Sequence, residues 1–97
     1  MGQNAKTTAI NENKKVLDEF LQRYPKTQRA ENGGIDFSAT ERNNITTMIS
    51  IYRIDKLTLD KLNFILNKFT LGDTYPNIRE WQVLKIMEDA KKAGIIE

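Results

Sequence analysis

Residues 57–70, Leu-Thr-Leu-Asp-Lys-Leu-Asn-Phe-Ile-Leu-Asn-Lys-Phe-Thr, hold the clearest pattern in the chain. Their apolar residues recur three and four positions apart, which places them on one side of an α-helix. Thr58 or its neighbour can cap the start, because a threonine oxygen accepts a hydrogen bond from an unpaired amide of the first turn. An amphipathic helix is therefore predicted. Its core side holds Leu59, Leu62, Ile65, Leu66 and Phe69.

A second helix is predicted to follow, from about residue 78 to residue 93. Asn77 is well placed to cap its start, and Gly94 can end it in the left-handed conformation that glycine adopts easily. Residues 94–96 are the one stretch where a short strand could follow. One apolar arc of this helix holds Val83, Ile86, Met87, Ala90 and Ala93.

Two further helices are predicted in the first half of the chain. From about residue 11 to residue 24, the apolar residues Val16, Leu17, Phe20, Leu21 and Tyr24 share one side, and Pro25 ends the helix. Residues 1–9 are small and polar, so a flexible N-terminus is expected there. Residues 25–37 contain Asn-Gly-Gly, a turn signal, and are predicted to be a connector loop.

The sequence Ser38-Ala39-Thr40-Glu41 matches a capping box and predicts the start of the next helix. In this motif the serine oxygen accepts from a backbone amide, and the glutamate side chain accepts from the amide of the cap residue. The β-branched residues between 45 and 52 also suit a strand, but the helical spacing is favoured. The predicted core face holds Ile45, Met48, Ile49 and Tyr52.

Length and composition fit one small domain. The chain has 97 residues, 39% of them hydrophobic, and no cysteine. No run of about 18 apolar residues occurs, so no membrane span is predicted, and a cytoplasmic protein is expected. We predict an all-α, four-helix domain with a single helical unit over residues 10–97.

Few residues suit catalysis. The chain has no histidine, which is the usual proton shuttle near neutral pH and the commonest metal ligand. The neighbouring carboxylates Asp18-Glu19 and Glu88-Asp89 would point about 100° apart on a helix, so they cannot converge on one atom. No phosphate-binding loop is present. We therefore expect no enzyme activity, no catalytic or metal-binding residue, no cofactor and no small-molecule substrate.

Residues 41–97, ending Glu88-Asp89-Ala90-Lys91-Lys92-Ala93-Gly94-Ile95-Ile96-Glu97, resemble the three-helix core of winged-helix and helix-turn-helix proteins, without the wing. In that family the last helix enters the major groove of DNA. The resemblance implies that base contacts would come from Asn77, Arg79, Glu80, Gln82 and Lys85. Residues 1–30 carry six basic and three acidic residues, so phosphate contacts are expected there. The candidates are Lys14, Lys15, Lys26 and Arg29.

The last helix also has a second apolar side, formed by Trp81 and Leu84, and Phe64 lies opposite the core side of its own helix. Either the N-terminal helix buries these residues, or they form a surface for a protein partner. Two functions follow. The first is a small regulatory protein that binds nucleic acid; the alternative is a protein-binding adaptor, inhibitor or assembly component, which includes a homodimer. The high content of Ile, Lys and Asn suits an AT-rich bacterial or phage genome.

Overall fold

The computed structural model describes residues 5–24, 37–70 and 80–96, without the side chains of residues 69 and 70. They form four helices: α1 (Ala5–Arg23), α2 (Ala39–Ile51), α3 (Leu59–Thr70) and α4 (Glu80–Lys92). Within these ranges there is no strand, so the prediction of an all-α, four-helix protein is confirmed, and residues 94–96 do not form a strand. None of these four helices is long and apolar enough to cross a bilayer.

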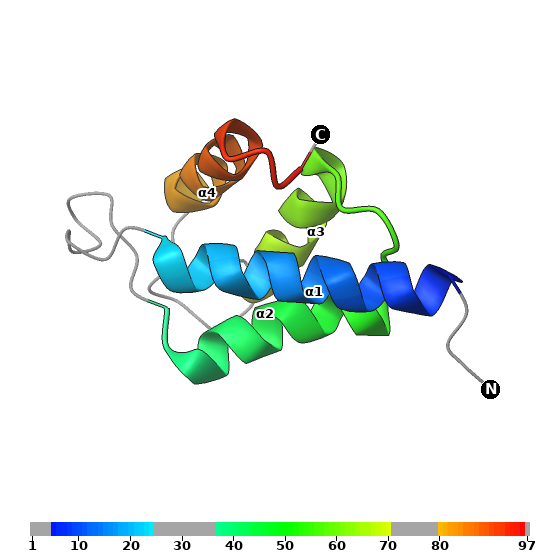
Figure 1. Ribbon diagram of the computed structural model, residues 1–97. Helices are drawn as coiled ribbons and strands as arrows, with labels where there is room; N and C mark the ends of the chain where they lie inside the picture. Colours follow the sequence, from blue (N-terminus) through cyan, green and yellow to red (C-terminus); the bar gives the residue numbers. More distant parts are fainter. Residues whose placement is uncertain (1–4, 25–36, 71–79, 97) are drawn as a thin grey trace.

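The helices form two pairs (Figure 1). α1 and α2 lie side by side and run in opposite directions, and α3 packs against α4. The first turn of α1 therefore lies near the end of α2, at the same end of the molecule as the joint between α2 and α3. The first turn of α4 lies toward the other end.

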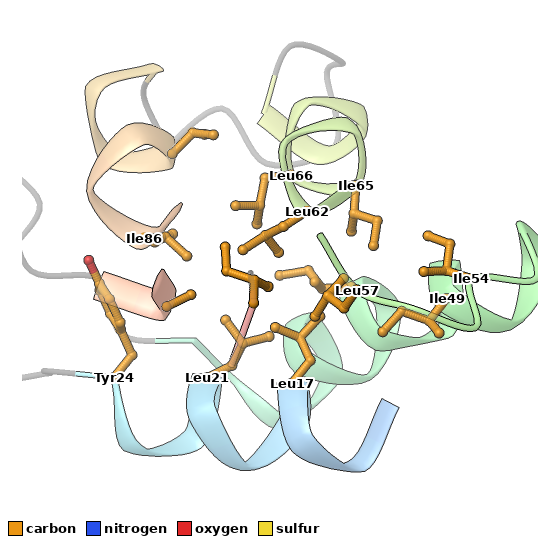
Figure 2. Close-up of a cluster of buried hydrophobic side chains, with 14 of the residues drawn as sticks. Leu17, Leu21, Tyr24, Ile49, Ile54, Leu57, Leu62, Ile65, Leu66 and Ile86 are labelled. Atoms are coloured by element: carbon orange, nitrogen blue, oxygen red, sulfur yellow. The ribbon is translucent and has the colours of Figure 1, made fainter. Parts of the chain in front are cut away.

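The core lies where the apolar sides of all four helices meet (Figure 2). The predicted core side of α3 is confirmed for Leu62, Ile65 and Leu66, with Leu59 partly buried, and the side chain of Phe69 lies outside the described residues. The predicted arc on α4 is confirmed for Val83, Ile86 and Ala90, with Met87 partly buried. Ala93 was wrongly included in that arc: it follows the last residue of α4 and is exposed. Apolar side chains at helical spacing remove the most surface from water when each helix turns that side inward. The most deeply buried side chains are Leu17, Leu21, Phe37, Ile45, Ile49, Leu62, Ile65, Leu66, Gln82, Val83 and Ile86.

α1 differs from the prediction in two respects, its first residue and the exposure of Val16. The helix begins at Ala5 instead of about residue 11, so residues 5–9, expected to be flexible, are helical. Ile10 explains the longer helix: it lies two turns before Leu17, on the same side, and is buried. Val16, which was expected on the core side, is exposed at the edge of that side.

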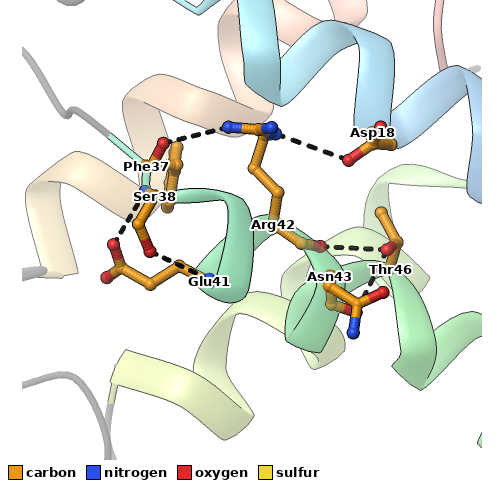
Figure 3. A network of polar contacts seen from close by, with 7 residues as sticks. All are labelled: Asp18, Phe37, Ser38, Glu41, Arg42, Asn43 and Thr46. Carbon is orange, nitrogen blue, oxygen red and sulfur yellow. Dashed lines mark hydrogen bonds and ion pairs between the residues drawn. The ribbon is translucent and has the colours of Figure 1, made fainter.

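The predicted capping box at the start of α2 is confirmed (Figure 3). The Ser38 hydroxyl oxygen accepts from the Glu41 amide at 3.1 Å, and the Ser38 amide donates to the Glu41 carboxylate at 2.9 Å. At the start of α3, the Lys61 amide donates to the Thr58 hydroxyl oxygen at 3.3 Å, so Thr58 is the cap. The predicted cap at Asn77 and most of the 25–37 connector lie outside the described residues.

One arginine joins α1 to the start of α2 (Figure 3). Arg42 donates from Nη1 to the Phe37 carbonyl oxygen at 3.2 Å, and its Nε lies 3.5 Å from a carboxylate oxygen of Asp18 on α1. The second contact is an ion pair, too long for a well-formed hydrogen bond. Because the Arg42 side chain is largely buried and that of Asp18 is half exposed, the pair orients the two helices more than it stabilises them.

Two helices end in the same backbone motif, in which a left-handed residue allows two amides to reach back to the last turn. In α4 that residue is Gly94, at φ 75°, as predicted; Ile95 donates to the Ala90 carbonyl at 3.0 Å. In α2 the same place is taken by Arg53, at φ 54°, and Ile54 donates to the Ile49 carbonyl at 2.9 Å. An L-residue in this conformation costs about 1–2 kcal/mol more than glycine.

The hydroxyl of Tyr24, at the end of α1, is buried beside α4. Burial raises the pKa of Tyr24 well above its ordinary value, and the nearby carboxylate of Asp89 raises it further. Among the described residues no hydrogen bond of good geometry reaches the hydroxyl. The ring is well packed, with edge-to-face contacts to Phe20 at 5.5 Å and to Phe37 at 6.4 Å between ring centroids.

Replacement of Arg53 by glycine is expected to raise the free energy of unfolding by about 0.5–1 kcal/mol, because glycine removes the Cβ strain at this φ while adding some entropy to the unfolded chain. Urea denaturation measures the change. Ser50→Gly, in the exposed last turn of α2, is the matched control and should lower stability by about 0.5–1 kcal/mol. An Arg53→Gly variant less stable than the parent would contradict the conformational argument.

Tyr24→Phe should leave the free energy of unfolding at neutral pH unchanged or raise it by up to about 1 kcal/mol, because it removes a buried, unpaired hydroxyl and keeps the ring. The substitution should also change how the free energy of unfolding depends on pH above about 10. Above pH of about 10 the unfolded chain releases the tyrosine proton while the folded chain keeps it, so the parent protein loses stability as pH rises. Urea unfolding at pH 7 and at about pH 11 should show a smaller loss in the variant; equal losses would contradict the shifted pKa.

Candidate functional site

The outward side of α4 carries two large apolar side chains. Val83 and Ile86 point into the core, whereas Trp81 is 44% exposed and Leu84 is 58% exposed. Trp81 and Leu84 lie three positions apart, so they are neighbours on the helix surface. We call these two residues the α4 ridge. Of the two alternatives raised by the sequence, burial by the N-terminal helix or exposure, the structure shows exposure.

Charges of both signs flank the α4 ridge. Lys85, one turn after Trp81, is exposed. Glu88, one turn after Leu84, forms an ion pair of 3.1 Å with Lys92. Their hydrogen bond lowers the pKa of the Glu88 carboxyl and raises the pKa of the Lys92 ammonium. The ridge is therefore apolar at its centre, with a rim of mixed charge, a distribution typical of protein-binding surfaces.

Phe64 lies on a different surface from the α4 ridge. It is 41% exposed on α3, and its ring meets that of Tyr52 edge to face, with 4.8 Å between centroids and an interplanar angle of 88°. The Lys68 ammonium lies 5.1 Å from the Phe64 centroid. Among the described residues Phe64 makes no ring contact with Trp81. Phe64 contacts the residue that caps the end of α2, and that end lies away from the first turn of α4 (Figure 1), so the three residues predicted to bind one partner are divided between two surfaces.

Tyr52 is a residue whose place the sequence predicted wrongly. It was expected on the core face with Ile45 and Ile49, but it is 45% exposed. Tyr52 is the C-cap residue of α2, and its amide still donates to the Met48 carbonyl at 2.9 Å, but its ring packs against Phe64 outside the core. We call Tyr52 and Phe64 the aromatic pair. No signal in the sequence marks their contact.

Of the residues predicted to bind nucleic acid, the structure describes Lys14 and Lys15 on α1 and Gln82 and Lys85 on α4. The prediction that Gln82 contacts bases was wrong. Gln82 is only 1% exposed, because it lies one turn before Ile86 and faces the core with it. Lys85 is exposed on α4, Lys15 is exposed on α1, and Lys14 is half-buried. Four of the predicted residues lie outside the described ranges: Asn77, Arg79, Lys26 and Arg29.

The described part of the chain offers little for metal or acid–base chemistry. Within residues 5–24, 37–70 and 80–96 there is no cluster of three or more side chains that could hold a metal ion. The large pKa shift described above belongs to the tyrosine in the core, away from both exposed apolar surfaces.

Trp81 is the only tryptophan in the chain, so its fluorescence reports directly on the α4 ridge. We expect acrylamide to quench native Trp81 strongly, approaching the quenching of the urea-unfolded chain, because the indole is open to solvent. Trp81→Phe should change the free energy of unfolding by no more than about 0.5 kcal/mol. A blue-shifted emission that acrylamide barely quenches would instead place Trp81 in the core.

Comparisons were made with models of protein families, with curated proteins and with solved structures. None of the three finds a match to this chain. The helix-turn-helix resemblance of residues 41–97 accordingly stays a prediction.

Proposed function

We propose that the protein is a non-enzymatic binding protein and that the α4 ridge inserts into an apolar groove on another protein. The exposure of Trp81 and Leu84 is the observation that supports this function. The opposite side of α4 already contributes to the core through Val83, Ile86 and Ala90, so folding does not account for the ridge. Amphipathic helices bind grooves through anchors spaced three or four positions apart, and Trp81 and Leu84 are three positions apart.

The shape of the ridge favours a concave partner over a second copy of this chain. A stable interface of standard size buries about 800 Å² on each partner. Two partly exposed side chains on a convex helix cannot supply that area against an identical convex helix. A groove covers more of each side chain, and tryptophan is among the residues that most often dominate binding energy. The mixed charges of Lys85, Glu88 and Lys92 would then lie at the rim.

Nucleic-acid binding by α4 is the weaker candidate. Lys85 is exposed, as that function needs, but Gln82 is buried. Glu80 and Glu88 are also exposed on the same helix, and they would repel phosphates. The helix-turn-helix function therefore depends on Asn77 and Arg79, which lie outside the described residues.

The test places a photo-crosslinking amino acid at Leu84 and, as a matched control, at Ile51, which is exposed at the end of α2. We expect an adduct from position 84 only, formed in cells that express the full chain, and abolished by Trp81→Ala. With the adduct partner purified, calorimetry should show affinity weakened at least tenfold by Trp81→Ala and unchanged by Ile51→Ala. Helical circular dichroism of each variant verifies folding.

Two results would overturn the proposal. One is equal crosslinking from positions 84 and 51; the other is a partner whose affinity Trp81→Ala does not change. A measurement of molecular mass in solution tests whether the partner is a second copy of this chain. We expect a monomer at micromolar concentration. A dimer that Trp81→Ala dissociates would show that the α4 ridge binds a second copy of this chain and not a groove on another protein.

A further inference from the structure

A second exposed surface lies at the end of the molecule where the first turn of α1 meets the α2–α3 joint (Figure 1). Its centre is the aromatic pair, Tyr52 and Phe64. The two rings meet edge to face, so the edge of one lies against a single face of the other, and both remain more than two-fifths exposed. Aromatic faces open to solvent are platforms on which unpaired nucleic-acid bases stack.

Basic residues lie beside the aromatic pair on α3 and in the α2–α3 joint. Lys68 lies over the Phe64 ring, and Lys61, one turn before Phe64, is on the same side of α3. Arg53 follows Tyr52 directly and is exposed. Arg53 also lines a shallow groove of about 320 Å³ together with Lys6 of α1. Among the described residues none of these four cations forms an ion pair.

Acidic groups are fewer on this surface. Asp55 and Asp60 are exposed in the joint and in the first turn of α3. Asp60 lies one turn before Phe64, on the flank away from Lys61 and Lys68. Asn63 and Asn67 bond to one another on that flank, at 3.1 Å. The surface thus combines two half-exposed aromatic rings, one of which has a lysine over it, with more basic than acidic side chains among the described residues.

We propose that this surface binds single-stranded nucleic acid. One or two bases stack on Tyr52 and Phe64, and the neighbouring phosphates lie at Lys68 on one side and at Arg53 and Lys6 on the other. Single strands fit better than a duplex, because bases inside a duplex offer no free face for stacking. A protein ligand is less well matched than at the α4 ridge, where charges of both signs form the rim. The function is separate from that of the α4 ridge and uses different residues.

Fluorescence anisotropy with a labelled oligo-dT of about 15 nucleotides, a length that suits ordinary single-strand site sizes, tests the proposal on the full chain. Binding should be measurable at low salt and should weaken as salt rises. Tyr52→Leu and Phe64→Leu, which keep an apolar side chain, should each weaken binding about fivefold to tenfold. Lys68→Gln should weaken binding and reduce the slope of log affinity against log salt by about one.

Lys85→Gln is the matched control, because it removes an exposed lysine from α4 and leaves the aromatic pair intact. It should not change oligo-dT affinity, and neither should Trp81→Ala. No binding at low salt would overturn the proposal. Equal loss with Lys85→Gln, or a duplex bound as tightly as the single strand, would also overturn it and would favour α4 as a duplex reader. A protein crosslinked through Phe64, with no affinity for oligo-dT, would show a protein-binding surface instead.

Discussion

Burial of Leu17 and Leu21 holds the helices in one unit, because α1 shares a core with both the α2 side and the α3–α4 side of the molecule. Figure 2 shows these two side chains extending from α1 toward Leu57, Leu62 and Ile86. Both are fully buried. Polar contacts such as Asp18–Arg42 lie at the margin of this core, where they fix the angle and register of helices that apolar burial has already brought together.

The same constraint explains which parts of the fold could be predicted from the sequence. Apolar spacing predicts the inward sides of α3 and α4 because that spacing is what burial requires. Short-range signals at Ser38, Thr58 and Gly94 predicted helix ends correctly, since capping depends on neighbouring residues alone. Each of these predictions needs information from no more than a few turns of helix.

The errors concern residues whose positions depend on the tertiary structure. Gln82 is polar, so its type suggested the surface, but its place one turn before Ile86 carries it into the core. Tyr52 is apolar enough for a core, but it caps the end of α2, and its ring packs against Phe64 of another helix instead. Contacts between side chains from different helices, such as the aromatic pair, have no local signature. The exposed side of α4 and the exposure of Phe64 could therefore be predicted from the sequence, whereas the contact between Phe64 and Tyr52 could not.

The α4 ridge and the aromatic pair differ in chemistry as well as in place. The first turn of α4 and the α2–α3 joint lie toward opposite ends of the molecule (Figure 1), so a ligand at one need not exclude a ligand at the other. A rigid domain that holds two ligands at once acts as a tether, and each ligand then meets the other at a raised effective concentration. Two modest affinities, joined through a shared core, would together bring a protein to a nucleic-acid strand more strongly than either contact alone.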